Sequence, residues 1–570
     1  MEPLLLVTVL LLAHAVAYLV CTAVARRRRS RCYLVDYVCH KPSDDRKVST
    51  EMAASVVLHN KRLSLPEYRF LLRVIVRSGI GEESYCPRNI LECREDAPTH
   101  QDALDEMDAF FDEAIADLFL KSGFLPGDVD VLVVNVCMFS PAPSLACRIV
   151  HRFGMREDVA AYNLSGMGCS AGLVSLDLAR NVLRTRPTSL ALVVSSESIA
   201  PNWYTGTDRS MMLGNCLFRC GGSAVLLTND PLLRGRAKMV LRHLVRTNTA
   251  ADDEAHASAL QRDDGNGRVG ISLSKALPKA AVRALTLNLR SLIPRLLPVS
   301  ELLRFAARDI YKKFRLSGVH VKTDIRPGPM INFKTGVEHF CLHPGGTRVI
   351  EAVKDSLGVD ADDVEPSQMT LHRWGNTSSS SLWYVLSYME AKGRLKRGDR
   401  ALMLTFGSGF KCNSCLWEVT GDMADKGAWA DCIDEYPPES STNPYLDKYS
   451  WIDEEPCLRQ VAFQFTDTGR RFLASAKEKV EENCCYLEWI DPECDLKERI
   501  EKKKLADHSS TNLHQVLRTK AEKEREQLVL ERDQMKEEKK RPECIISDMM
   551  KENHGYNDKV KKLKEICDEF

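Results

Sequence analysis

The sequence predicts an α/β protein whose body consists of two similar halves. Short, continuous apolar runs of strand length form a first group at 129–136, 160–164, 190–194 and 224–227. Segments with apolar residues at helical spacing separate these runs, notably 102–121 and 171–183. A second group follows, with strands expected at 337–342 and 401–405 and helices at 347–357 and 380–391. Uninterrupted apolar runs are typical of strands buried on both faces, so the alternation predicts helices that cover a sheet.

Composition and charge agree with a large folded protein. The 570 residues suffice for several domains of about 100 to 200 residues each, or for one duplicated fold. The 79 Lys and Arg residues balance 79 Asp and Glu residues, so the overall charge does not suggest a nucleic-acid partner. The 20 cysteines are scattered, unlike the dense cysteines of a small secreted scaffold, and we expect free thiols in a cytosolic body.

The N-terminus predicts a membrane anchor. Residues 3–25 form an apolar run without a formally charged side chain, and a membrane-spanning helix needs roughly 20 such residues. Four arginines follow at 26–29, whereas a cleaved signal peptide, the alternative, has a basic start and a shorter apolar stretch. We therefore expect an anchor with its basic flank at 1–31. Because basic residues near a span favour the cytoplasmic side, the remainder should lie in the cytosol.

Two further regions lie outside the halves. The segment 33–90 mixes charges, turn residues and short helical patterns such as 68–76, and we expect it to be a lead-in to the first half. The character of the chain changes after Asp431, and Pro437 and Pro438 mark a break. From 495 to 570 the chain is dominated by Lys, Glu and Arg with a sparse apolar stripe, which favours a coiled coil or a solvated helix, with disorder as the alternative.

One cysteine stands where a nucleophile would be expected. Cys169 follows two glycines in the segment 163–172, at the junction of an expected strand and an expected helix. The positive end of a helix dipole lowers the pKa of a thiol, and the free backbone N–H groups there can stabilise an oxyanion. The alternative is a small, inert core residue, which is common for free cysteines.

Two further polar residues occupy comparable positions. His343 leaves an expected strand at a tight turn before a helix, within 338–346, and Asn376 stands at another helix start, within 371–381. Helix starts of this kind can direct polar groups into a shared cleft. Cys169, His343 and Asn376 are therefore the candidate catalytic residues.

At these residues the sequence resembles the plant 3-ketoacyl-CoA synthases, the condensing enzymes of very-long-chain fatty acid elongation in the thiolase-like superfamily. The resemblance runs through 33–36, 163–172, 208–211, 215–219, 270–275, 343–346, 375–381 and 406–414. It implies a duplicated, five-layered αβαβα core, with the nucleophile in a half at 32–235 and the histidine and asparagine in a half at 236–440. It also implies an endoplasmic-reticulum membrane protein with a cytosolic catalytic domain.

The resemblance implies a Cys-His-Asn catalytic set at Cys169, His343 and Asn376, with acyl-CoA and malonyl-CoA as substrates and no metal or other cofactor. The acyl group passes to the cysteine, and the other two residues stabilise the enolate formed as CO2 leaves malonyl-CoA. The products would be long 3-ketoacyl-CoA precursors of wax, cutin or suberin. The family resemblance also suggests a homodimer and partners among the elongase-complex enzymes.

Four further positions follow from the same resemblance. His339 and His372 match histidines that recur in the family, and both a buried supporting role and a direct role in the site are open for them. Gly407 and Gly409 belong to a segment similar to a glycine-rich active-site loop, although a tight turn explains the same glycines.

The sequence also departs from the family pattern. Asn248 stands where the family commonly has a histidine, and the chain has one expected membrane helix instead of two. The segment 441–494 resembles a degenerate GRF-type zinc finger without a cysteine at 474–476, so a four-ligand zinc site is not expected. Two alternatives remain open: a weak or inactive paralogue that acts as an elongase-complex subunit, and a type III polyketide-synthase-like enzyme.

Overall fold

The computed structural model describes residues 31–316, 331–440, 457–461, 471–475 and 487–489. The chain forms two units, a body that ends at Pro456 and a second unit that begins at Cys457. The expected anchor, apart from Arg31, and the charged tail lie outside the described residues. Within the described ranges, no helix combines the length and the apolar character that a bilayer crossing requires.

One sheet of nine strands organises the described part of the body, in the order β11-β12-β13-β8-β1-β7-β6-β4-β5. Its strands are β1 (Cys32–Cys39), β4 (Val131–Asn135), β5 (Ala160–Leu164), β6 (Leu190–Ser196), β7 (Gly222–Thr228), β8 (Met239–Asn248), β11 (His339–Leu342), β12 (Arg400–Gly407) and β13 (Lys411–Val419). The predicted strands of both groups are confirmed within a few residues at each end.

The sheet contains the same arrangement twice. In the first half the order β4-β6-β7-β1 begins with a parallel pair and continues with two antiparallel pairs. In the second half the order β11-β12-β13-β8 repeats that pattern. β1 pairs with β8 and joins the halves, and β5 extends only the first one. The prediction of two similar α/β halves is therefore confirmed.

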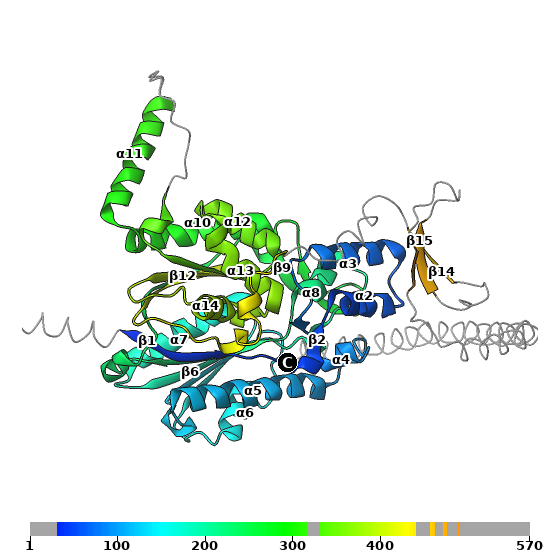
Figure 1. Ribbon diagram of the computed structural model, residues 1–570, viewed down its shortest axis with the longest axis horizontal. Coiled ribbons are helices and arrows are strands. Elements are labelled where there is room, and N and C mark those ends of the chain that lie inside the picture. Colours follow the sequence, from blue (N-terminus) through cyan, green and yellow to red (C-terminus); the bar gives the residue numbers. More distant parts are fainter. Residues whose placement is uncertain (1–30, 317–330, 441–456, 462–470, 476–486, 490–570) are drawn as a thin grey trace, which may run out of the picture. The chain divides into compact units, whose positions relative to one another are not determined.

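Helices cover both faces of each half. The principal ones are α5 (His100–Ser122), α6 (Leu145–Arg152), α7 (Ala171–Thr185), α10 (Leu277–Leu296), α12 (Thr347–Leu357), α13 (Ala361–Trp374) and α14 (Ser381–Ala391). Figure 1 shows α7 and α14 between the two halves of the sheet, α5 and α6 below the first half, and α10 and α12 above the second. The body therefore has five alternating layers of helix and strand.

The alternation of side chains along each strand produces these layers. In β4, Val133 packs into the inner core around α7 and α14, whereas Leu132 packs into the outer core around α5. In β12, Met403 belongs to the inner core and Leu402 to the outer core around α10 and α12. Because both faces of the strands are buried, their sequences are apolar without interruption.

The prediction that 33–90 is only a lead-in is wrong. β1 occupies the centre of the sheet between β7 and β8. Its sequence contains Asp36, which interrupts an otherwise apolar strand and is neutralised by Lys121 at 3.0 Å and Lys238 at 3.5 Å. The rest of this segment includes β2 (Lys47–Val48), α2 (Thr50–His59), α3 (Leu65–Arg77), β3 (Ser84–Tyr85) and α4 (Arg88–Leu91).

The remaining elements of the body are α8 (Arg209–Leu217), α9 (Asp253–Ala257), the hairpin of β9 (Ala259–Asp263) and β10 (Val269–Leu273), and α11 (Val299–Leu316). The second unit contains an antiparallel sheet of β14 (Cys457–Val461), β15 (Arg471–Ser475) and β16 (Leu487–Trp489), which lies within the range 441–494. The described residues contain no cluster of three or more His, Cys, Asp or Glu side chains that could hold a metal ion.

Candidate active site

The turn that carries Cys169 connects β5 to α7. Gly166 and Gly168 have φ angles of 67° and 63°, a left-handed conformation that favours glycine. The short 3-10 turn η3 (Gly168–Ser170) follows and runs directly into α7. Cys169 therefore lies immediately before a helix, as predicted, and keeps part of its surface exposed.

The second half of the sheet holds this turn in place. Thr405 of β12 donates its hydroxyl to the Cys169 carbonyl at 3.1 Å, and Asn413 of β13 donates its amide to the Ser170 carbonyl at 3.3 Å. A Cβ atom on Gly407 would lie 2.6 Å from the Met167 carbonyl oxygen. The predicted glycine-rich loop thus lies against the turn that carries Cys169, and Gly407 permits that close approach. Gly409, with a φ of 93°, forms the adjoining bend.

Asn376 reaches the thiol from the segment between α13 and α14. Its backbone N–H donates to the Leu217 carbonyl and its carbonyl accepts from the Arg219 N–H, each at 3.0 Å. The side-chain oxygen accepts the Ser378 N–H at 2.9 Å, which leaves the NH2 group to hydrogen-bond the Cys169 thiol. The fixed orientation of the amide directs its NH2 group, a hydrogen-bond donor, to the Cys169 thiol.

His343 belongs to the same region through β12. Its backbone N–H donates to the Leu404 carbonyl at 2.9 Å, and the next residue, Thr405, holds the Cys169 carbonyl. The side chain is buried, and its Nδ1 atom has no hydrogen-bond partner among the described residues. Burial lowers the pKa of His343 to about 4, so the imidazole is neutral at physiological pH.

The thiol of Cys169 is not activated by its position alone. Burial raises its pKa to about 11, and the negative charge of Glu197 adds to this effect, whereas hydrogen bonds from Ser378 and Asn376 lower the pKa. The expectation that the helix start lowers the thiol pKa is therefore wrong in this structure, because desolvation exceeds the favourable contacts. The thiol needs a proton acceptor when it reacts, and the neutral imidazole of His343 is suited to that role.

Sequence reasoning missed two residues beside the thiol. Glu197 follows β6, is buried, and accepts the Met138 N–H at 2.8 Å and the Ser378 hydroxyl at 3.1 Å. Burial raises the pKa of Glu197 to about 7. Ser378 has a φ of 58°, a conformation that few non-glycine residues adopt. In the sequence, the one sign of this pair was that the carboxylate residue Glu197 stands directly after an apolar strand.

The other predicted supporting residues lie at different places. His339 begins β11, and its Nε2 atom is 2.9 Å from an Asp399 carboxylate oxygen. The Nδ1 atom of His372 is 2.9 Å from the Tyr436 hydroxyl. Asn248 ends β8 with an exposed side chain, whose oxygen accepts the Ala250 N–H at 3.0 Å. The sequence alone did not distinguish these positions from Cys169 and Asn376, whose side chains lie together.

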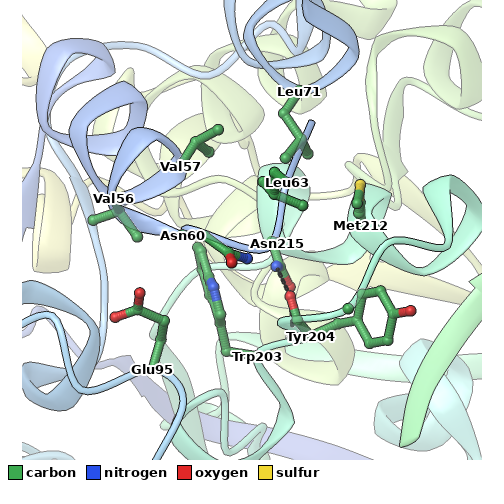
Figure 2. Close-up of a pocket in the computed structure, with 11 residues that line it drawn as sticks. Val56, Val57, Asn60, Leu63, Leu71, Glu95, Trp203, Tyr204, Met212 and Asn215 are labelled. Carbon is green, nitrogen blue, oxygen red and sulfur yellow. Dashed lines mark hydrogen bonds between the residues drawn. The ribbon is translucent and has the colours of Figure 1, made fainter. Parts of the chain in front are cut away.

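A separate cavity lies between α2, α3 and α8, and Figure 2 shows its lining. Apolar side chains such as Val57, Leu71 and Met212 form one side of it. Elsewhere in the lining, the Asn215 side chain donates a hydrogen bond to the Tyr204 carbonyl at 2.7 Å, which holds the two residues together. None of the three candidate catalytic residues lines this cavity, so it is distinct from the site around Cys169.

The reactivity of Cys169 should depend steeply on pH. Because the thiolate is the nucleophile and its pKa is about 11, alkylation by iodoacetamide should accelerate about tenfold per pH unit below that value. At fixed pH, Ser378→Ala should slow alkylation because it removes a side chain that lowers the pKa of the thiol. Glu197→Gln should accelerate it because it removes a repelling charge. Peptide mass spectrometry measures the rates, with the exposed Cys147 as internal reference.

Opposite shifts for the two variants would support this account of the thiol. If Ser378→Ala and Glu197→Gln changed the alkylation rates of Cys169 and Cys147 equally, the proposed contacts would not control the thiol.

The contact between α7 and the turn after Asn376 should be sensitive to added volume. A Cβ atom on Gly172 would overlap the Ser379 carbonyl oxygen, which belongs to the backbone and cannot move aside independently. Gly172→Ala should therefore reduce the free energy of unfolding by about 1–3 kcal/mol. Chemical denaturation measures the change. Gly127→Ala is the matched control, because a Cβ atom there meets no atom within 4 Å; equal stability of the two variants would contradict the prediction.

Comparisons with known proteins cover most of the body. Residues 23–314 match the family model "FAE1/Type III polyketide synthase-like protein", and residues 334–419 match "3-Oxoacyl-[acyl-carrier-protein (ACP)] synthase III C terminal". The chain is 51% identical to 3-ketoacyl-CoA synthase 12 of Arabidopsis thaliana over 445 residues, which cover 76% of this chain and 94% of that protein. It is 50% identical to 3-ketoacyl-CoA synthase 3 of the same organism over 461 residues, covering 78% and 96%.

Solved structures with the same fold are more distant in sequence. A type III pentaketide synthase from Neurospora crassa has a TM-score of 0.52 at 18% identity, covering 68% of this chain and 99% of that one. CsyB complexed with CoA-SH has a TM-score of 0.52 at 17% identity, covering 68% and 100%. At this level of identity the likeness concerns the fold, and it confirms the thiolase-like α/β core that the sequence resemblance implied.

Proposed function

The chain belongs to the 3-ketoacyl-CoA synthase family, and from this premise we propose that it condenses a long-chain acyl-CoA with malonyl-CoA. The products are 3-ketoacyl-CoA, CO2 and CoA, in the elongation of very-long-chain fatty acids. The observation that carries the assignment to this site is the placement of the Asn376 amide beside the Cys169 thiol, on a turn that β12 also ties to His343.

In the first step, the Cys169 thiol attacks the acyl-CoA carbonyl. The sulfur–acyl bond forms, the carbon–sulfur bond to CoA breaks, and the thiol proton leaves with CoA by way of the neutral His343 imidazole. The backbone N–H groups at the start of α7 face the developing oxyanion. The raised pKa of the thiol makes this proton transfer necessary, because little thiolate exists at neutral pH.

In the second step, malonyl-CoA loses CO2 and its thioester becomes an enolate. Hydrogen bonds from His343 and Asn376 to the thioester oxygen stabilise the charge that arrives there. A neutral imidazole suits this role, since the departure of CO2 requires no proton abstraction. The enolate carbon then attacks the acyl-cysteine, forms the new carbon–carbon bond and releases Cys169.

We place the protein at the endoplasmic-reticulum membrane, with residues 1–31 as anchor and the body in the cytosol. The apolar run at 3–25 and the arginines that follow it support this location. We further propose that the protein forms a homodimer and works with the other elongase enzymes. The charged tail at 495–570 has the composition of a helix that could bind such a partner. The proposed chemistry uses only groups of the protein and the two substrates, without a metal or cofactor.

Microsomes that contain the full chain, supplied with labelled malonyl-CoA and acyl-CoA of increasing chain length, test this function. We expect malonyl-CoA-dependent formation of 3-ketoacyl-CoA from long-chain substrates. Repeated condensation on one starter would instead identify a polyketide-synthase-like enzyme. Absence of product at every chain length, with activity appearing in Asn248→His, would identify an inactive paralogue.

A further inference from the structure

Exposed apolar side chains are concentrated on one part of the body. Ten large apolar residues are exposed among the described residues, and four of them belong to α10 or the start of α11. Val299 and Leu303 are the most exposed of these, at 70% and 65% of their surface, and Val282 and Leu287 precede them. Such a concentration on a soluble surface marks an interaction site.

Val282 and Leu287 lie on the exposed side of α10, and Val299 and Leu303 lie on the first turns of α11, which begins after a break at Leu297 and Pro298. The opposite side of α10 packs Ala284, Leu285 and Leu292 into the outer core of the second half. The exposed residues of α10 run from Val282 to Arg295. After them, α11 projects away from the body (Figure 1). The apolar side chains therefore face solvent because of the helix register, and no other described element covers them.

The same side is positively charged. Between 277 and 307 the chain contains five basic residues and a single acidic one, Glu301, which is buried. The ion pairs of Lys279 and Arg283 attach the start of α10 to the segment around α9. Arg290 and Arg295 are exposed and form no ion pair within the described residues. We call Val282, Leu287, Arg290, Arg295, Val299 and Leu303 the apolar–basic face.

We propose that the apolar–basic face docks on an anionic lipid surface. Helices that lie at a membrane interface combine apolar side chains, which enter the headgroup boundary, with Arg and Lys side chains, which bind anionic lipids. A second copy of the chain is a poorer occupant, because a twofold contact would place two copies of this positively charged surface against each other. The proposal does not depend on the catalytic assignment.

The position of α10 in the fold is compatible with contact to a lipid surface. Asn288 of α10 donates to the Val245 carbonyl of β8, at 3.3 Å. β8 pairs with the first residues of β1, where the chain enters the body after the expected anchor. An anchor before Cys32 and the apolar–basic face could thus reach one membrane plane, which would fix the orientation of the body.

Hydrogen-exchange mass spectrometry on the full chain in lipid nanodiscs tests the proposal. We expect the peptides that span 282–303 to exchange several-fold more slowly in discs containing phosphatidylserine than in discs of phosphatidylcholine alone. Arg290→Glu with Arg295→Glu should abolish this difference. Arg184→Glu with Arg397→Glu changes the net charge equally at exposed positions elsewhere and should preserve it.

Three results would overturn the proposal: equal exchange in the two kinds of disc, equal behaviour of the two charge-reversed variants, or protection that follows protein concentration instead of lipid charge. Exchange in β4 and β6 reports whether each variant is folded. If the charge-reversed protein is unfolded, Val299→Ser with Leu303→Ser provides a second test. Loss of protection is expected, and unchanged protection would again overturn the proposal.

Discussion

Replacing Cys169 by alanine is expected to abolish condensation, with a loss of roughly 10³-fold or more in the rate of 3-ketoacyl-CoA formation. The change removes the atom that carries the acyl group, and the other cysteines near this turn cannot replace it. Cys137, for example, donates its thiol to the Gly168 carbonyl at 3.4 Å, and burial raises its pKa well above the ordinary value. A microsomal assay with labelled malonyl-CoA measures the loss.

The same variant separates the two proposed steps. His343 and Asn376 remain in Cys169→Ala, so it should still release CO2 from malonyl-CoA. Mass spectrometry of the wild-type protein with acyl-CoA alone should show the acyl group on the peptide containing Cys169. Cys147→Ala, a change at an exposed cysteine of α6, is the matched control and should leave both steps intact. Full condensation by Cys169→Ala would refute the assignment of the nucleophile.

Most of the fold could be predicted because its strands are buried on both faces. Uninterrupted apolar runs such as those of β4 and β6 have few alternative interpretations when helices of clear periodicity separate them. β1 was not predicted as a strand because Asp36 interrupts its apolar sequence. The lysines that neutralise Asp36, Lys121 and Lys238, lie far from it in the sequence. Local sequence contains no information about such distant partners.

In the site, too, some properties depend on neighbouring residues in the sequence and others on residues far away. The positions of Cys169, His343 and Asn376 at the ends of strands or starts of helices are local properties, and the sequence indicated them. The pKa of the thiol depends on burial by both halves of the protein and on Glu197, which is 28 residues away in the chain. The prediction of an activated thiolate failed because it considered the helix start alone.

The duplicated fold explains why the site lies between the halves. The turn with Cys169 precedes α7 in the first half, and the turn Ser378–Ser380 precedes α14 at the matching place in the second. Ser379 donates to Asn135 of β4 at 2.5 Å, while Thr405 of β12 donates to Cys169. Each turn is thus held by a strand of the other half, so the contacts around Cys169 and Ser379 form only when both halves are folded.

Replacing His343 by alanine should slow the decarboxylation of malonyl-CoA by roughly 10²- to 10³-fold, the effect typical of losing one donor to a developing oxyanion. In the Cys169→Ala background, CO2 release measures this step without acyl transfer. Because burial lowers the pKa of His343 to about 4, protonation should begin to affect the step only as the pH falls towards that value. An imidazole with an ordinary pKa would impose its limit near pH 6.5 instead.

Two comparisons make this prediction specific to the site. His151→Ala changes an exposed histidine on α6 and should leave decarboxylation unchanged. In the background with Cys169 intact, His343→Ala should also slow acylation of the cysteine, since the high pKa of the thiol requires a proton acceptor. If alanine at position 343 slowed acylation but not decarboxylation, the histidine would serve as a base for the thiol alone, and Asn376 would have to stabilise the enolate without it.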